Sequence, residues 1–492
     1  MVFQSTRGPY TADAAGAILS GMAPDGGLFV DPLLETRPFD TVQCLSLDPL
    51  SMQSMILRHL LGDLGDMDTL VRRGYEGKFD TPELTPLVAV GDDYMLELFR
   101  GPTAAFKDVA LSMLPQLLKA AKERNGVSGR TVVLTATSGD TGKAALEGFA
   151  GVEGTHIFVF YPHGGVSAVQ RAQMVTQTGD NVTVCAVRGN FDDCQSAVKR
   201  AFAALAENRE LRARSIGLTS ANSINVGRLA PQPLYYFLAY ASLLRAGKIR
   251  YGEKVDYVVP TGNFGDILAG WMAGRMGLPV GRLICASNAN RVLTDFFRTG
   301  VYDRRRAFYR TASPSMDILV SSNLERLLYY ASGGDTDAVR AEMAELEKTG
   351  QYAPPPAVMA RIRSGFEAFC CDDAEGAKTI GAVWKESGYL CDPHTAVAAH
   401  AARIWKQTRE EDAPVVILST ASPYKFPAAV LDALGAEPDG DEFARMDALC
   451  RLSGVPVPKS LSGLRDREVL HSDVIDASEI IPYILKKLTE VC

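Results

Sequence analysis

The chain has 492 residues, of which 47% are hydrophobic and 22% charged, proportions that are ordinary for a globular protein of two or three domains. Its net charge of −7 and the lack of a basic stripe argue against a nucleic-acid-binding protein. The nine cysteines are scattered without CxxC or Cys/His spacing, which predicts reduced thiols and no metal site.

The sequence shows no sign of a secretion signal or of a membrane segment. The N-terminus has no charged segment followed by an apolar one, and no window approaches the roughly 18 consecutive apolar residues of a transmembrane helix. We therefore expect a cytoplasmic protein with neither a membrane nor a nucleic-acid partner.

Residues 1–95 predict a mixed α/β region at the N-terminus. Residues 11–22 have helical spacing of small and apolar side chains and end at the turn signal PDGG. Residues 28–30 predict a short strand. Residues 50–61 repeat Met and Leu at helical spacing, which is typical of a helix packed on a core.

Residues 96–111, LELFRGPTAAFKDVAL, place a lysine in unusually apolar surroundings. An apolar run ends at Phe99, the chain turns at Gly101-Pro102, and a helical pattern begins between residues 103 and 106. Burial lowers the pKa of a lysine, so the amine of Lys107 becomes available for Schiff-base chemistry. A buried salt bridge of Lys107 is an equal interpretation of this stretch.

Alternating strands and helices follow, and they predict an α/β fold with parallel-rich sheets. The predicted strands are 130–137, 156–161, 181–187, 255–260, 283–286 and 414–420, and the helices between them include 143–150, 167–178 and 192–208. We expect two three-layer α/β domains, a smaller one at 96–230 and a larger one at 231–492. Residues 322–387 predict a helical insertion on the outside of the larger domain.

Two glycine-rich loops lie between a predicted strand and a predicted helix, SGDTG at 138–142 and TGNFGD at 261–266. A helix N-terminus offers unpaired N–H groups to an anion, and glycine allows close approach. Neither loop matches the P-loop or GxGxxG patterns. Together with a desolvated lysine, they fit pyridoxal phosphate, which needs a lysine, a phosphate cradle and polar partners for its ring.

Five segments carry a resemblance to a known family: GPTAAFKD, TATSGDTGKAA, NSINVGR, PTGNFGD and DPHTAV. Together they resemble the threonine synthase family, among the pyridoxal-phosphate enzymes of the tryptophan synthase β type (fold type II). The opening STRG…DGGLF resembles the longer fungal and bacterial form. The resemblance implies pyridoxal 5'-phosphate in a cleft between two domains, and a monomer or homodimer with a small-molecule substrate.

The resemblance also implies a role for each matching residue. Lys107 binds the cofactor aldehyde and shuttles protons, and the Thr420 hydroxyl forms a hydrogen bond with the pyridine nitrogen. Asp140 lies near the phenolic oxygen, to which an ionised carboxylate cannot donate. The phosphate cradle is formed or adjoined by Gly262, Asn263, Phe264, Gly265 and Asp266. The substrate carboxylate is held by Ser138 and Thr141, and the substrate phosphate by Asn222, Ser223 and Arg228.

Two further positions have no assigned role. His394 matches the family pattern, and a structural histidine explains it as well as a catalytic one. Arg100 stands where related sequences often have histidine.

The implied reaction converts O-phospho-L-homoserine and water into L-threonine and phosphate by γ-elimination and β-addition of water. Three alternatives stay open at this point. They are a serine/threonine dehydratase or cysteine synthase on the same scaffold, a phospho-lyase that releases 2-oxobutyrate, and a pyridoxal-phosphate-binding protein without turnover.

Overall fold

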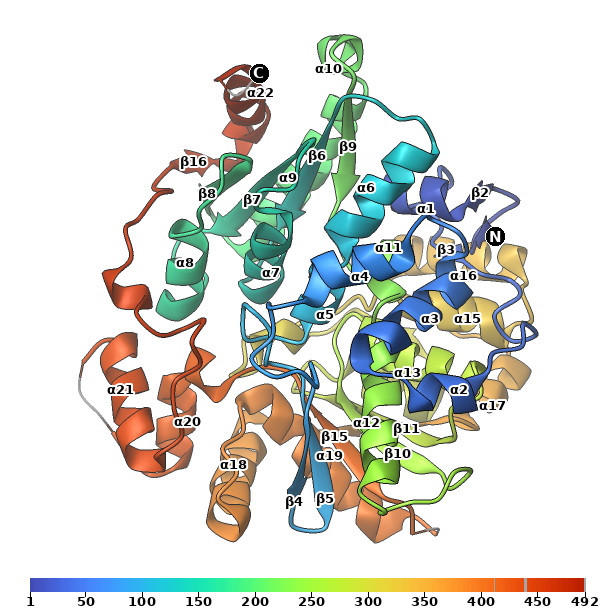
Figure 1. Cartoon of the computed structure of the whole chain (residues 1–492), viewed down its shortest axis with the longest axis vertical. Helices are drawn as coiled ribbons and strands as arrows, with labels where there is room; N and C mark the ends of the chain where they lie inside the picture. Colours follow the sequence, from blue (N-terminus) through green and yellow to red (C-terminus); the bar gives the residue numbers. More distant parts are fainter. Residues whose placement is uncertain (411, 438–439, 491–492) are drawn as a thin grey trace.

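The computed structural model describes residues 1–410, 412–437 and 440–490. Two large parallel-rich sheets form its framework, one in the upper and one in the lower half of Figure 1, and helices pack around both. The predicted α/β class with two three-layer domains is confirmed.

The larger sheet has six strands in the order β14-β11-β10-β15-β5-β4, all parallel except the pair β4–β5. Because parallel strands end at one edge of a sheet, the segments that follow β5, β10 and β15 meet there. These segments carry Lys107, the TGNFGD loop and Thr420. The strands are β4 (Leu87–Val90), β5 (Asp93–Glu97), β10 (Val255–Pro260), β11 (Val280–Ser287), β14 (Phe366–Cys370) and β15 (Val415–Ser419).

The smaller sheet has five parallel strands in the order β16-β8-β7-β6-β9. β7 is buried along its whole length, which explains its continuous apolar run. The SGDTG loop follows β6, and the NSINVGR segment follows β9. The strands are β6 (Arg130–Ala136), β7 (Thr155–Pro162), β8 (Val182–Arg188), β9 (Ile216–Ser220) and β16 (Val474–Asp476).

The N-terminal region forms a three-stranded sheet and four helices. The predicted helix 11–22 is only partly correct, because the Asp13 side chain caps the helix at Gly16 N and leaves residues 11–13 extended. The predicted helix 50–61 is confirmed as α3. The elements are β1 (Val2–Ser5), β2 (Thr11–Asp13), β3 (Phe29–Val30), α1 (Ala14–Ser20), α2 (Thr41–Ser46), α3 (Pro49–Leu61) and α4 (Met67–Tyr75).

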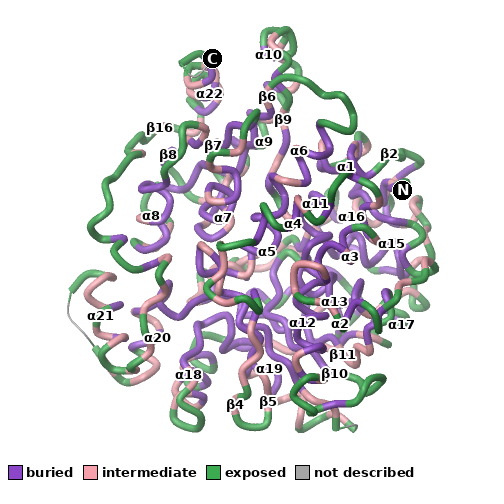
Figure 2. Tube along the Cα trace, in the orientation of Figure 1, coloured by how far each residue is buried: buried purple, intermediate pink, exposed green. Residues whose placement is uncertain are grey.

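The remaining helices cover the two sheets or lie between them. Figure 2 shows buried chain through both sheets and through α5, α12 and α13, whose residues are mostly buried. No described helix is long and apolar enough to cross a membrane. The helices are α5 (Lys107–Leu111), α6 (Leu114–Arg124), α7 (Asp140–Phe149), α8 (Ala168–Val175), α9 (Phe191–Ala206), α10 (Arg209–Ala213), α11 (Val226–Leu229), α12 (Pro233–Arg245), α13 (Gly265–Arg275), α14 (Val292–Thr299), α19 (Pro393–Thr408), α20 (Pro427–Ala433), α21 (Glu442–Ser453) and α22 (Ile480–Glu490).

The predicted helical insertion at 322–387 is wrong in one respect. The segment does contain α15 (Leu324–Ala331), α16 (Thr336–Thr349), α17 (Pro356–Arg363) and α18 (Asp373–Ser387). It also supplies β14, which pairs in parallel with β11 and forms one edge of the larger sheet. The strand is short and lies between charged helices, so its apolar residues gave no separate strand signal.

Strand pairing also crosses the domain limits that we expected. β4 and β5 precede or span residue 96 and belong to the larger sheet. β16 lies far into the segment 231–492 but pairs with β8 of the smaller sheet, and α22 packs against α9. Each sheet is therefore assembled from segments that are distant in sequence, which local patterns do not reveal.

Candidate active site

Lys107 begins α5 and is held to the end of β15 by backbone hydrogen bonds. Phe106 N donates to Thr420 O at 2.8 Å, and Ser422 N donates to Ala104 O at 3.1 Å. Ala104 has φ of 57°, a left-handed conformation that is uncommon outside glycine and is often found at functional sites. The structure therefore brings Lys107 and Thr420 together, as the sequence implied.

Asp108 shapes the turn that precedes Lys107. Its carboxylate accepts hydrogen bonds from Thr103 N at 2.9 Å and from Thr103 Oγ1 at 2.5 Å. A Cβ atom on Gly101 would lie 2.5 Å from Asp108 Cβ, so only glycine fits there. Burial raises the pKa of Asp108 to about 6.

Lys107 is buried, and burial lowers its pKa to about 8. Its Nζ lies 3.8 Å from Asp140 Oδ2, an ion pair that is longer than a hydrogen bond. Asp140 and Asp266 raise the pKa, whereas Arg228 and Lys425 lower it. Lys107 therefore has the carboxylate neighbour of the salt-bridge interpretation, and its lowered pKa fits the Schiff-base interpretation, which stays a prediction.

Asp140 lies at the centre of a polar cluster. Its Oδ1 lies 2.5 Å from Lys425 Nζ and accepts from Gln170 Nε2 at 2.9 Å, and its Oδ2 accepts from Ser315 Oγ at 3.3 Å. Burial alone would raise the pKa of Asp140, but Lys425 and Lys107 outweigh burial and hold it well below the usual range. Asp140 is therefore ionised and only accepts hydrogen bonds.

Sequence reasoning missed Lys425, Gln170 and Ser315. A signal for Lys425 existed, because it lies between Tyr424 and Phe426 in an apolar segment, much as Lys107 does. Gln170 and Ser315 reach the site from α8 and from the 3-10 turn Pro314–Met316, and their sequence contexts are unremarkable.

Both glycine-rich loops approach other chain segments closely. A Cβ atom on Gly262 would lie 2.9 Å from Ser315 O, and one on Gly139 would lie 2.4 Å from the Gln170 side chain. Gly139 has φ of 139°, which also requires glycine. In the same loop, Thr137 Oγ1 accepts from Gly139 N and Gly142 N at 3.0 and 2.8 Å, which shapes the start of α7.

The TGNFGD loop is fixed by its neighbours and leaves mainly backbone to meet an anion. Ser321 Oγ donates to Gly262 O at 2.7 Å, and Asn323 Nδ2 donates to Asn263 O at 2.9 Å. Phe264 has a left-handed φ of 66° at the start of α13, and its buried ring packs against Phe297 and Phe366. Phe264 can therefore contribute to a phosphate cradle only through its backbone.

Gly265 and Asp266 occupy the first turn of α13. Asp266 Oδ1 accepts from Ile267 N at 2.8 Å, and its carbonyl accepts from Tyr236 OH at 2.8 Å. Burial raises the pKa of Asp266 to about 6. The glycines, the strained backbone and the helix start fit a phosphate group, and the nearby amine of Lys107 fits an aldehyde.

Arg228 is a buried cation that has no carboxylate partner among the described residues. Its Nη1 donates to Ala221 O at 2.9 Å, but its Nε has no hydrogen-bond partner, and no ion pair joins it to a described carboxylate. Burial lowers its pKa to about 10. An unsatisfied buried guanidinium fits an anion with several oxygens. Asn222, which is exposed, and Ser223, which is half-buried, lie on the loop before α11.

Arg326 connects three segments around the site and was not predicted. Its Nε donates to Phe29 O at 3.0 Å, its Nη2 donates to Ile224 O at 2.5 Å, and its Nη1 donates to Asn323 Oδ1. The side chain is almost completely buried. Arg326 thus ties the N-terminal sheet, the NSINVGR segment and the support of the TGNFGD loop into one unit.

His394 and Arg100, which the sequence left without a role, both have partners. His394 Nδ1 lies 2.6 Å from Asp392 Oδ2, and its Nε2 accepts from Ser315 N at 3.1 Å. Arg100 Nε donates to the buried Glu97 at 2.7 Å. His394 therefore supports the Ser315 segment beside Asp140, whereas Arg100 pairs with Glu97 at the end of β5.

A cleft of about 240 Å³ adjoins this cluster, since Gln170 lines the cleft and donates to Asp140. Ser138 lies in its wall and is half-buried, and Thr141, also half-buried, lies in the first turn of α7. The other lining residues include Ser167, Gln170, Thr311, Phe426 and Glu442.

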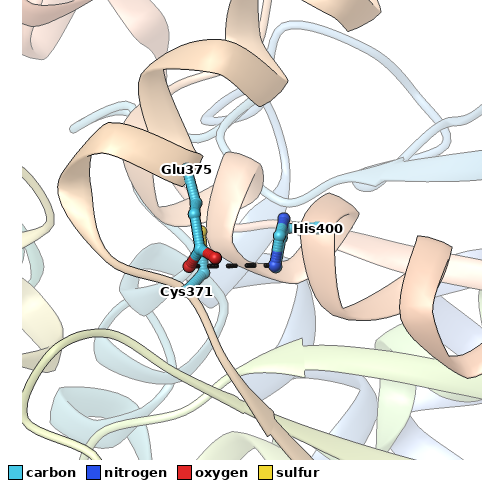
Figure 3. A group of neighbouring side chains, drawn as sticks. All are labelled: Cys371, Glu375 and His400. Atoms are coloured by element: carbon cyan, nitrogen blue, oxygen red, sulfur yellow. Dashed lines mark ion pairs between the residues drawn. The ribbon is translucent and has the colours of Figure 1, made fainter.

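A separate group of potential metal ligands consists of Cys371, which follows β14, Glu375 on α18 and His400 on α19 (Figure 3). Glu375 accepts from Asp372 N at 3.0 Å, and the Cys371 thiol donates to Asp372 O at 3.4 Å. Burial raises the pKa of Cys371, which opposes the thiolate that a metal needs. We interpret these side chains as groups that cap and pack α18.

Comparison with known proteins decides the family. Residues 91–421 match the family described as pyridoxal-phosphate dependent enzyme, and residues 395–480 match the C-terminal family of threonine synthase. The threonine synthase of Pseudomonas aeruginosa is 39% identical over 436 residues, which cover 87% of this chain and 90% of that protein. The chain belongs to the threonine synthase family. Membership makes it a pyridoxal-phosphate-dependent enzyme, to whose cofactor the residues around Lys107 are suited.

Other members of the threonine synthase family are also similar to this chain. The Saccharomyces cerevisiae threonine synthase is 37% identical, over 88% of this chain and 89% of that protein. The crystal structure of pyridoxal-phosphate-bound threonine synthase from Brucella melitensis has a TM-score of 0.87 and 37% identity, and it covers 99% of both chains. Human threonine synthase-like 1 is 36% identical, but the match covers only 57% of that protein.

Proposed function

We propose that the protein converts O-phospho-L-homoserine and water into L-threonine and phosphate. The observation that carries this proposal is Arg228, a buried guanidinium beside Lys107 that lacks a counter-ion among the described residues. Burying such a charge is costly, and a substrate phosphate would satisfy it bidentately. A dehydratase or cysteine synthase, whose substrates lack phosphate, would not need it.

The chain's own residues divide the work as follows. Lys107 Nζ would hold the cofactor through its aldehyde and would accept the proton from the substrate α carbon. Pyridoxal phosphate, when bound, supplies an electron sink for the pair released at that carbon. Thr420 would hold the pyridine nitrogen through its hydroxyl, and Asp140 would accept rather than donate near the phenolic oxygen.

The phosphates and the carboxylate are held at separate places. The loop 262–266 would cradle the cofactor phosphate with backbone N–H groups at the start of α13. Arg228, Asn222 and Ser223 would hold the substrate phosphate and stabilise it as it leaves the γ carbon. Ser138 and Thr141 would hold the substrate α-carboxylate at the start of α7. Burial of Lys107, Asp140 and Arg228 would exclude water other than the reacting molecule.

Product analysis tests this function. The purified protein, loaded with pyridoxal phosphate, is incubated with O-phospho-L-homoserine, and threonine, phosphate and 2-oxobutyrate are measured. We expect threonine and phosphate in equal amounts. Phosphate with 2-oxobutyrate and no threonine would instead identify a phospho-lyase, and bound cofactor without any product would identify a binding protein.

A matched pair of variants tests the phosphate site. Arg228→Met should abolish phosphate release, whereas Arg245→Met, which removes an exposed arginine at the end of α12, should leave it unchanged. Equal activity of the two variants would contradict the proposed role of Arg228.

We also propose that the protein acts in the cytoplasm as a monomer or homodimer. The eight described cysteines are all free thiols, which supports a reducing compartment. Light scattering after size exclusion would measure the assembly directly, and a mass above that of two chains would contradict the proposal.

A further inference from the structure

We propose that Lys425 is a further positioning residue of the active site, because it takes Asp140 as its ion-pair partner and so leaves the amine of Lys107 free for the cofactor. The inference rests on Lys107 as the attachment residue of the proposed function. Lys425 ends the 3-10 turn Pro423–Lys425, shortly after Thr420, and its side chain is 0% exposed.

The two lysines compete unequally for one carboxylate. Lys425 Nζ lies 2.5 Å from Asp140 Oδ1, whereas Lys107 Nζ lies 3.8 Å from Oδ2. The first contact is a charge-assisted hydrogen bond, and the second is beyond hydrogen-bonding range. Gln170 and Ser315 donate to the same carboxylate at 2.9 and 3.3 Å. Asp140 is therefore satisfied without a hydrogen bond from Lys107.

Lys425 itself is firmly anchored. Its Nζ donates to Thr103 O at 3.2 Å, and its backbone N donates to Ser422 O at 3.1 Å. Thr103 belongs to the turn that Asp108 holds before Lys107. The Lys425 ammonium is sealed from solvent. Asp140 is its one charged partner among the described ion pairs.

The charges around Lys107 give the direction of the effect. The groups that act on it are Asp140, Asp266, Arg228 and Lys425. Without Lys425, the site loses a cation that lowers the pKa of Lys107, and Asp140 is released to pair with Lys107. Both changes raise the pKa of Lys107, so a smaller fraction of the amine than in the wild type would be unprotonated at any given pH.

The test measures this pKa without any turnover. The full-length chain, freed of cofactor, is methylated with formaldehyde and cyanoborohydride at a series of pH values, and modification of Lys107 is followed by peptide mass spectrometry. The wild type should show a midpoint near pH 8. Lys425→Met should raise the midpoint by about 1 to 2 pH units, and Lys425→Arg should restore it.

Lys143→Met is the matched control. Lys143 is also a buried lysine, it lies on α7 as Asp140 does, and it pairs with Glu147 at 2.8 Å. Its loss should leave the Lys107 midpoint unchanged. The same midpoint in Lys425→Met and in wild type would overturn the inference.

A second comparison applies if Lys425→Met does not fold. Asp140→Asn is compared with Asp140→Asn/Lys425→Met, in which both buried charges are removed together. The double variant should have the higher Lys107 midpoint, and equal midpoints would overturn the inference. Neither result depends on which substrate the enzyme converts, so product analysis can fail while this test succeeds, and the reverse.

Discussion

His394 Nε2 accepts a hydrogen bond from Ser315 N at 3.1 Å, and Ser315 Oγ donates in turn to Asp140. Because Asp392 Oδ2 lies 2.6 Å from His394 Nδ1, the ring proton resides on Nδ1 and Nε2 is an acceptor. The histidine thus positions the Ser315 segment over the TGNFGD loop, where Ser315 O would meet a Cβ on Gly262.

His394→Ala should loosen this segment. Loss of the acceptor leaves Ser315 N unpaired, which costs about 1 to 3 kcal/mol when such a group is buried. We expect faster hydrogen exchange in residues 311–317 and weaker cofactor binding, measured by mass spectrometry and by absorbance titration. His400→Ala is the control, since His400 lies on the same helix with only a 3.9 Å contact to Glu375. Unchanged exchange in His394→Ala would contradict this role.

Arg228→Met should stabilise the protein while it destroys the anion site. Replacing an unpaired buried charge with an apolar side chain removes its desolvation cost, and we expect a gain of about 1 kcal/mol in the free energy of unfolding. Inorganic phosphate should raise the stability of the wild type by linkage but not that of the variant. Urea unfolding with phosphate, or with chloride at equal ionic strength, measures both. Equal stabilisation of the two proteins by phosphate would refute the anion site.

The loading of cofactor should depend on pH through Lys107. Its pKa is lowered to about 8, so the unprotonated amine increases as pH rises through that value. The reactive fraction grows from about a tenth at pH 7 to about nine-tenths at pH 9. Stopped-flow absorbance of the apoprotein mixed with pyridoxal phosphate should show a rate that rises about tenfold over this range. Lys107→Ala should not form the absorbance band of the cofactor bound to the lysine. A rate independent of pH in the wild type would contradict the lowered pKa.

Glu442 should help to hold α21 against the N-terminus of α8, which follows β7 of the smaller sheet. From α21 it accepts hydrogen bonds from Ala168 N at 2.6 Å and from Val169 N at 3.4 Å, at the start of α8. Glu442→Ala should reduce stability by about 0.5 to 2 kcal/mol, the usual value of a helix cap. Asp447→Asn removes an exposed ion pair on the same helix and should have almost no effect. Thermal unfolding compares them, and equal midpoints would argue against the cap.

Much of the fold follows from local pattern. Strand β10 has the limits that its apolar run predicts, and β15 differs from its predicted range only at its ends. These strands lead into the TGNFGD loop and Thr420, so the position of both relative to Lys107 follows from parallel pairing. Local pattern supplies neither a signal for very short strands nor their pairing across the chain, so β14 and β16 were missed.

The candidate site divides in the same way. The proximity of Lys107, Asp140 and Arg228 could be predicted because their motifs resemble those of one family. Arg228 is also buried with an Nε that has no hydrogen-bond partner, which fits a phosphate. Lys425 and Arg326 were missed because their importance lies in what they contact, Asp140 in one case and Ile224 O in the other. The functional roles of all the predicted site residues, including Ser138, Thr141, Asn222 and Ser223, stay predictions.

The pairing of β16 with β8 ties the smaller sheet to a distant part of the chain. β16 forms one edge of the sheet whose SGDTG loop carries Asp140, and α22 packs against α9 beside it. Loss of this pairing would expose the backbone edge of β8 and the apolar residues of α9 to water. The stability of the sheet that supports Asp140 therefore depends on a segment far along the chain from that residue.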